Sequence, residues 1–187
     1  ASNGPKPLTP AHYYARLSQR FLNAVTALTG EGRLYEVDMR LRPSGNKGPI
    51  ASSLEAFARY HKESAWTWER MALTRARVIC GPERLGRTTE AAIHSVLTEG
   101  RDPDVLLRDI ATMRERIARE HPAASLWDAK YCPGGLVDIE FVCQYLQLRH
   151  ASENDNVLRA NTHDALTAVA EAGFLPPSTA KTLTGAL

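Results

Sequence analysis

The chain has 187 residues, of which 43% are hydrophobic, and its 23 basic and 21 acidic side chains leave a formal net charge of +2. This length is enough for one moderate domain, or one and a half, with a real apolar core. The nearly balanced charge does not indicate binding to nucleic acid through a broad basic surface. No apolar run approaches the roughly 20 residues that span a bilayer, so no membrane association is expected.

The three cysteines indicate the cellular compartment. Cys80, Cys132 and Cys143 are odd in number and lack Cys-x-x-Cys spacing. This usage favours a reduced cytoplasm and no structural metal held by cysteine. The first seven residues have no signal-peptide pattern and are typical of a linker.

The N-terminal part predicts one helix and one strand. Thr9-Pro10 is typical of a helix start, and an apolar stripe with helical spacing continues up to Gly30. Residues 33–42 then alternate strictly between apolar and charged side chains, which predicts a strand. Its apolar face comprises Tyr35, Val37, Met39 and Leu41, and its charged face Glu36, Asp38, Arg40 and Arg42. A polar, glycine-containing loop follows over residues 43–49.

The remainder of the chain predicts helices. Ser52 to Glu55 resembles a capping box, and residues 51–79 contain no glycine or proline, so this stretch is expected to be helical with a break near Ser64. Further helices are expected from Thr88 or Thr89 to Gly100, from Asp102-Pro103 to Pro122, from Gly135 to about Ala151, from Asn161 or Thr162 to Gly173, and from Ser178 onward. The predicted fold class is therefore α+β, mostly α.

Three blocks of sequence, taken together, resemble one family. They are Tyr35-Glu36-Val37-Asp38-Met39-Arg40-Leu41-Arg42-Pro43-Ser44-Gly45, then Glu63 to Glu69 with Ala72 to Arg77, then Gly134 to Phe141. In this order they resemble the bacterial glutamine synthetase adenylyltransferases, and the adenylylating C-terminal half more closely than the adenylyl-removing half. The resemblance implies a partial nucleotidyltransferase fold over residues 1–80, followed by a helical bundle domain over residues 81–187 that is incomplete at its C-terminus.

The resemblance also implies a chemistry for the intact protein. AMP would pass from ATP, with Mg²⁺ as cofactor, to a tyrosine of glutamine synthetase, with the PII signal protein and glutamine as regulators. Asp38 would be the catalytic, metal-binding carboxylate, and the nucleotide would be bound by Arg40, Arg42, Ser44 and Gly45. Without the resemblance, an ion pair of Asp38 with Arg40 or Arg42 is the favoured interpretation.

One part of the family's pattern is missing. Enzymes of this kind carry a Gly-Ser loop and an Asp-x-Asp pair ahead of a third metal-binding carboxylate, which the resemblance places at Asp38. Residues 1–32 contain neither the loop nor the pair. The sole Asp-x-Asp, Asp102-Pro103-Asp104, lies later and is typical of a helix N-terminus. We therefore expect the chain to be a fragment that is inactive on its own.

The second and third blocks predict a cleft or a junction between domains, formed by Glu69, Arg75, Arg77 and Glu140. On a helix, Arg75 and Arg77 would point about 200° apart and would not face the same phosphate. Glu140 either pairs with one of these arginines or lines a cleft for the target protein or a regulator.

Two other functions stay open at this stage. The chain could be a helical module for protein interaction without catalysis, or it could be the related deadenylylating domain. In addition, an unpaired strand edge tends to recruit another strand, so self-association is expected.

Overall fold

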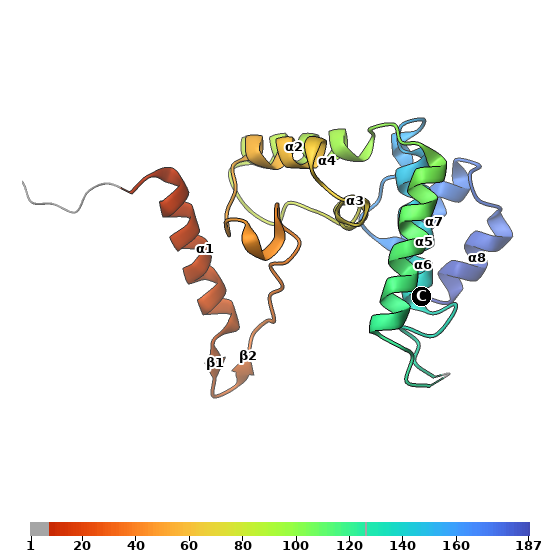
Figure 1. Cartoon of the computed structure of the whole chain (residues 1–187), viewed down its shortest axis with the longest axis horizontal. Helices are drawn as coiled ribbons and strands as arrows, with labels where there is room; N and C mark the ends of the chain where they lie inside the picture. Colours follow the sequence, from red (N-terminus) through yellow and green to blue (C-terminus); the bar gives the residue numbers. More distant parts are fainter. Residues whose placement is uncertain (1–7, 126) are drawn as a thin grey trace, which may run out of the picture. The chain divides into compact units, whose positions relative to one another are not determined.

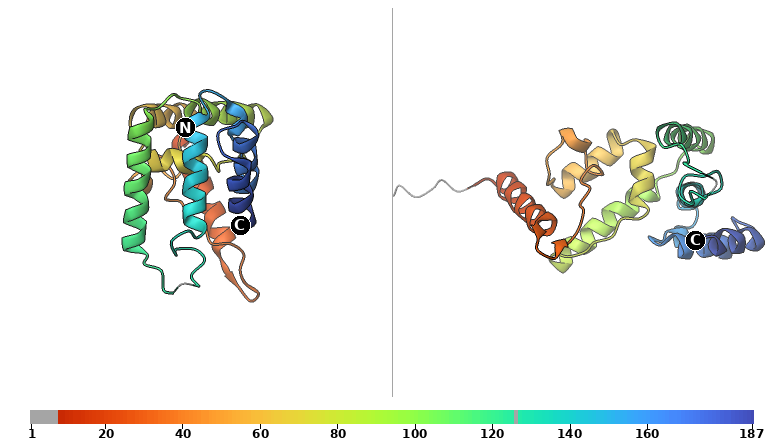
Figure 2. Two further views of the ribbon diagram at one scale, coloured as in Figure 1. Left: turned by 90° about the vertical axis from the view of Figure 1, so that its right-hand side faces the viewer. Right: turned by 90° about the horizontal axis from the view of Figure 1, so that it is seen from below.

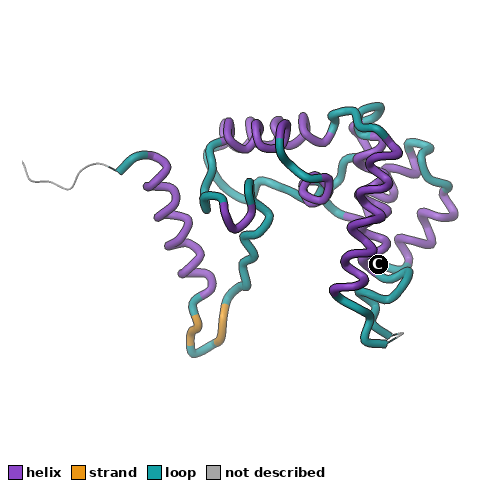
Figure 3. The backbone as a smooth tube through the Cα atoms, in the orientation of Figure 1, coloured by secondary structure: helices purple, strands orange, loops and turns teal. Residues whose placement is uncertain are grey.

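The computed structural model describes residues 8–125 and 127–187. Contacts divide the chain into two compact units, Ala1–Ser64 and Ala65–Leu187. Across the described residues there are eight α-helices and one two-stranded sheet, which confirms a mostly α fold with a small β component (Figure 3). Among the described residues, no helix is both long and apolar enough to cross a membrane.

The first unit opens with helix α1, Pro10–Thr26. The Thr9 side chain accepts a hydrogen bond from the backbone N–H of His12, and Pro10 occupies the first turn, so the predicted helix start is confirmed. The helix ends before Gly30, because β1, Leu28–Thr29, turns back and pairs antiparallel with β2, Gly32–Arg33.

The predicted strand over residues 33–42 is wrong beyond Arg33. No strand is present over residues 34–42, since no neighbouring segment supplies a ladder of hydrogen bonds. The Asp38 side chain also accepts a hydrogen bond from the Arg40 backbone N–H, a local turn that competes with extended pairing. The apolar side chains of this segment are largely open to solvent, with Tyr35 64% and Leu41 65% exposed.

Helix α2, Leu54–Glu63, completes the first unit and ends next to Ser64, where the break was predicted. The Ser53 hydroxyl accepts a hydrogen bond from the Ala56 backbone N–H. Glu55 lies one position too early for the reciprocal half of a capping box, so only the serine half of that prediction is confirmed.

The second unit is helical. It contains α3 (Thr67–Leu73), α4 (Glu83–Leu97), α5 (Pro103–Glu120), α6 (Leu136–His150), α7 (Thr162–Glu171) and α8 (Pro177–Gly185). Helix α5 packs on α3 and α6, α6 on α7, and α7 on α8 (Figures 1 and 2). The side chains of Leu106, Ile110 and Leu148 are buried where α5 meets α6, and Ala165 and Leu166 of α7 pack on the other side of α6.

Sequence signals located most boundaries in this unit. The starts of α5 and α7 are confirmed, with Asp102 and Asn161 as the capping side chains. Helix α4 begins at Glu83 instead of Thr88 or Thr89. The two threonines lie inside the helix, where their hydroxyls donate to the carbonyls of Arg84 and Leu85, so neither caps it.

The two tryptophans of the second block separate in the structure. Trp68 packs against the core, whereas Trp66 is 71% exposed.

Candidate functional site

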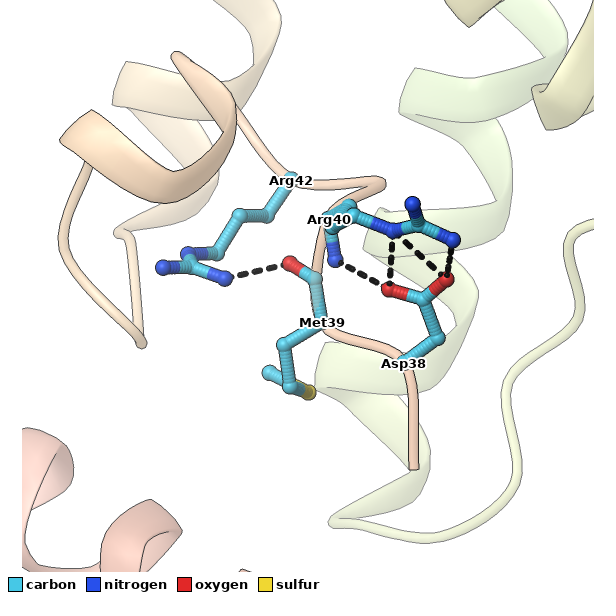
Figure 4. Close-up of polar contacts among 4 residues, drawn as sticks. All are labelled: Asp38, Met39, Arg40 and Arg42. Carbon is cyan, nitrogen blue, oxygen red and sulfur yellow. Dashed lines mark hydrogen bonds and ion pairs between the residues drawn. The ribbon is translucent and has the colours of Figure 1, made fainter. Parts of the chain in front are cut away.

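The segment after β2 brings Asp38 and Arg40 together. Both side-chain oxygens of Asp38 accept from Arg40: Nε lies 3.0 Å from Oδ1 and 2.9 Å from Oδ2, and Nη2 lies 2.6 Å from Oδ2 (Figure 4). The Arg40 backbone N–H adds a fourth contact, 2.9 Å from Oδ1. Two guanidinium nitrogens thus contact the two carboxylate oxygens, a bidentate arrangement.

The pair shifts the titration of both groups. Hydrogen bonds from the Arg40 side chain and backbone lower the pKa of Asp38 from its ordinary 3.8 to about 2, and Asp38 raises the pKa of Arg40. With this pKa, the Asp38 carboxylate is ionised throughout the physiological range. Both side chains are more than half exposed, so solvent screens the pair and its contribution to stability is small.

Arg42 turns away from Asp38 toward its own turn. Its Nη1 donates to the Met39 carbonyl oxygen (Figure 4). Its Nε is buried and has no acceptor within the part of the chain that the structure describes. A buried donor without an acceptor is costly, which favours a ligand oxygen at this position.

The loop after Arg42 is tightly folded. Ser44 has φ 62° and Gly45 φ 52°, both in the left-handed region, and the Gly45 N–H donates to the Arg42 carbonyl. A Cβ atom at Gly48 would lie 2.1 Å from the Pro43 carbonyl oxygen, so only glycine fits there. Gly45 begins a short 3₁₀ turn, Gly45–Lys47, so Ser44 and Gly45 lie where the chain turns directly after Arg42.

A magnesium site does not fit this arrangement as it stands. Both oxygens of Asp38 are engaged by Arg40, and the described residues contain no group of three His, Cys, Asp or Glu side chains able to hold a metal. A divalent cation requires several oxygen ligands, and one paired carboxylate does not supply them.

In the second unit, the structure joins Arg75 to Glu140. Arg75 Nη1 donates to Glu140 Oε1 over 2.7 Å and connects the segment after α3 to helix α6. Of the two alternatives for Glu140, the ion pair is therefore formed. Glu69 is buried, and its carboxylate accepts the Trp66 backbone N–H at the start of α3, a capping role that we did not predict.

The expectation that Arg75 and Arg77 face away from each other is wrong. Helix α3 ends at Leu73, so the helical spacing on which it was based does not apply. Both arginines border one cavity of about 370 Å³, together with residues 160–163 and Leu187. In a non-helical segment, residues i and i+2 can lie on the same side of the chain.

Asp138 is held by a partner that the sequence did not indicate. Its two oxygens accept from Nε and Nη2 of Arg114 on α5, and Oδ2 also accepts the Gly134 backbone N–H at 2.7 Å. These hydrogen bonds lower the pKa of Asp138, the Arg114 side chain contributing most. No spacing rule links residues 114 and 138, because they meet only when α5 packs on α6.

Comparison with known proteins relates the two parts of the chain to two families. Residues 1–92 match the family of glutamate-ammonia ligase adenylyltransferases, and residues 104–187 match the GlnD PII-uridylyltransferase family. Three relatives are bifunctional glutamine synthetase adenylyltransferase/adenylyl-removing enzymes. The one from Bradyrhizobium diazoefficiens is 49% identical, over 99% of this chain and 19% of its own length. The one from Rhodopseudomonas palustris strain TIE-1 is 48% identical, over 97% of this chain and 18% of its own length. The one from Rhizobium meliloti is 51% identical, over 87% of this chain and 16% of its own length.

The chain thus spans about one fifth of the length of the curated relatives it matches. The similarity covers nearly every residue of the chain, including all three blocks that carried the resemblance. The chain belongs to the family of glutamine synthetase adenylyltransferases and corresponds to one segment of them.

Proposed function

We propose that this chain is part of a nucleotidyltransferase that transfers AMP from ATP to a tyrosine of glutamine synthetase and thereby regulates nitrogen assimilation. The observation that carries the proposal is the 49% identity, over 99% of the chain, to an enzyme whose name states glutamine synthetase adenylyltransferase activity. The aligned region includes the Asp38-to-Gly45 segment, where a carboxylate, two arginines and a tight polar turn lie within eight residues.

The arginines of this segment are proposed to bind the nucleotide's phosphates. Arg40 presents a planar fork suited to two phosphate oxygens, and the buried Nε of Arg42 needs an acceptor. Ser44 and Gly45 lie in the turn and offer a hydroxyl and an unhindered backbone to the same ligand. If Arg40 left Asp38 to bind a phosphate, both carboxylate oxygens of Asp38 would become free. The ion pair would then be the state of the site without nucleotide.

The proposal assigns Asp38 the catalytic and metal-binding role. Magnesium would supply charge neutralisation of the phosphates when it is bound. Because residues 8–125 and 127–187 contain no group of side chains able to hold a metal, the other oxygen ligands are proposed to come from parts of the longer protein beyond residues 1–187. The 187-residue chain alone is then expected to be inactive.

Further features of the longer enzyme belong to the same proposal. Glutamine synthetase is the proposed target, PII and glutamine are the proposed regulators, and the cytoplasm is the proposed location. The catalytic portion is proposed to end near residue 80, with the helical bundle domain beyond it.

Two alternatives remain distinct. The unit over residues 65–187 has its own buried core, which favours a helical module that contacts other proteins without catalysis. The relatives' names also include adenylyl removal, so the segment could serve that reaction instead.

The test is transfer of labelled AMP from ATP to purified glutamine synthetase by the full-length enzyme and by the 187-residue chain. We expect transfer by the full-length enzyme and none by the chain alone. Asp38→Asn in the full-length enzyme should abolish transfer. Glu36→Gln is the matched control, since Glu36 lies two residues away and forms an ion pair with Arg33 at 3.7 Å, not with Arg40.

Release of AMP from modified glutamine synthetase, measured with the same variants, separates the two directions. If Asp38→Asn abolishes release and leaves transfer intact, the segment serves adenylyl removal. If neither reaction depends on Asp38, the interaction module is the better assignment.

A further inference from the structure

The cavity beside Arg75 and Arg77 lies entirely within the unit of residues 65–187 and involves none of the residues proposed to bind ATP. It has a volume of about 370 Å³, large enough for a small molecule. Two arginines, Arg75 and Arg77, and one histidine, His163, are among its lining residues. These groups are all hydrogen-bond donors or can become donors.

The two arginines differ in how their charge is used. Arg75 is paired with Glu140 over 2.7 Å, so part of its charge is neutralised. Arg77 forms no ion pair with any residue that the structure describes. An exposed arginine that borders a cavity and has no anionic partner is available to one from solution.

The beginning of helix α7 also lines the cavity. Residues 161–163 include the capping residue Asn161 and the first two helical residues, Thr162 and His163. Asn161 accepts the Asp164 N–H, whereas the N–H groups of the first two helical residues have no partner within a helix. These donors and the helix dipole add to the attraction of the arginines for an anion.

Two acidic side chains close to the lining residues are already engaged. Asp164 Oδ1 lies 3.6 Å from His163 Nδ1, and Glu140 holds Arg75. Neither carboxylate forms an ion pair with Arg77. The side chains that line the cavity are therefore basic, neutral polar or apolar, and none of them is acidic.

We propose that this cavity binds a small molecule through a phosphate or carboxylate group, with Arg77 as the principal contact and Arg75 and the start of α7 as supporting donors. Such a ligand would connect the segment after α3 to helix α7. This inference goes beyond the proposed adenylyl transfer and does not depend on it.

The test is titration of the 187-residue chain with inorganic phosphate, and separately with succinate, followed by the backbone amide signals of Thr162 and His163 in NMR spectra. We expect saturable shifts of both signals with at least one of the two anions. Saturation by phosphate alone would name a phosphorylated ligand, by succinate alone a carboxylate ligand, and by both the shared oxyanion chemistry.

Substitution identifies the contact. Arg77→Gln should weaken binding about tenfold, the loss expected for one charge-assisted contact of about 1.4 kcal/mol. Arg119→Gln removes the same charge from the last turn of α5, which does not border the cavity, and should leave the affinity within about twofold. Equal weakening in the two variants, or shifts that do not saturate with either anion, would overturn the proposal.

The last residue requires a further control, since Leu187 borders the cavity and carries the terminal carboxylate. A chain amidated at its C-terminus should bind the anion at least as tightly. Loss of binding on amidation would contradict the proposed site.

Discussion

Helix α1 in the first unit and helix α6 in the second are similar in length but opposite in burial. α1 buries none of its side chains, whereas α6 buries five, namely Val137, Ile139, Cys143, Gln147 and Leu148. Both helices begin where local sequence signals predict. The comparison teaches that a capped, periodic segment is sufficient to predict a helix, while burial depends on which elements pack against it.

The largest expected effect is loss of a core side chain in the second unit. Leu148 is 1% exposed within the cluster that joins α5 and α6, so Leu148→Ala should lower the free energy of unfolding by ~2–5 kcal/mol. Phe21→Ala in α1, where the ring is 63% exposed, should change it by less than about 0.5 kcal/mol. Urea denaturation followed by far-ultraviolet circular dichroism, which reports the helices of both units, measures both changes, and similar losses would remove the contrast between the units.

A second effect concerns the loop before α6. A Cβ atom at Gly135 would lie 2.6 Å from the Ala129 carbonyl oxygen, so Gly135→Ala should destabilise the second unit by ~1–3 kcal/mol. Gly100 has no atom within 4 Å of such a Cβ and is the matched control. Thermal denaturation of the two variants should differ clearly, and equal melting temperatures would show that the loop adjusts freely.

The ion pair between α5 and α6 has the next largest expected effect. Asp138→Asn removes the partner of a mostly buried Arg114 and should cost ~1–2 kcal/mol near neutral pH. Because the pKa of Asp138 is lowered in the folded chain, this contribution is present above the ordinary carboxyl pKa and is lost as the pH falls through the folded value.

Glu153→Gln is the control for Asp138→Asn. Glu153 is 55% exposed and pairs with Arg149 over 3.4 Å, so its loss should cost less than about 0.5 kcal/mol. Stability curves measured from neutral pH down to pH 2 would test the sign, and an Asp138 contribution that grows on acidification would contradict it.

The smallest effect on stability is expected at Asp38, although its titration should be clear. The carboxyl carbon signal of Asp38 in NMR spectra should titrate near pH 2, and Arg40→Gln should move its pKa up toward 3.8. Any stability that the lowered pKa contributes is present above 3.8 and disappears as the pH falls through about 2.

Arg33→Gln is the matched control for this titration, since Arg33 contacts Glu36 and not Asp38. An unchanged Asp38 titration in Arg40→Gln would show that the ion pair does not form in solution.

Much of the helical unit could be predicted from sequence, because its boundaries are marked by local chemistry. Asp102 and Asn161 cap helices through their own side chains, and Gly135 precedes α6 as expected. The candidate residues Asp38 and Arg40 also contact each other across two positions, which is why the sequence could anticipate their ion pair. Their catalytic role stays a prediction.

Predictions that required distant partners were less successful. The alternation of residues 33–42 describes a surface that could be one face of a sheet, but it contains no information about a second strand, and no ladder forms beyond Arg33. The orientation of Arg75 relative to Arg77 was wrong because α3 ends at Leu73, two residues before the first of them. Neither outcome follows from the residues concerned.

The sequence alone determined the family resemblance, the mostly α fold and the helix starts, because each depends on residues that are close in the chain. Only the tertiary structure decided that Asp138 pairs with Arg114, that Arg75 pairs with Glu140, and that both arginines after α3 border a cavity at the start of α7. The physical reason is distance along the chain. The first pair is separated by 24 positions, the second by 65, and the arginines lie more than 80 positions before the start of α7. These contacts exist only after helix packing has brought the elements together.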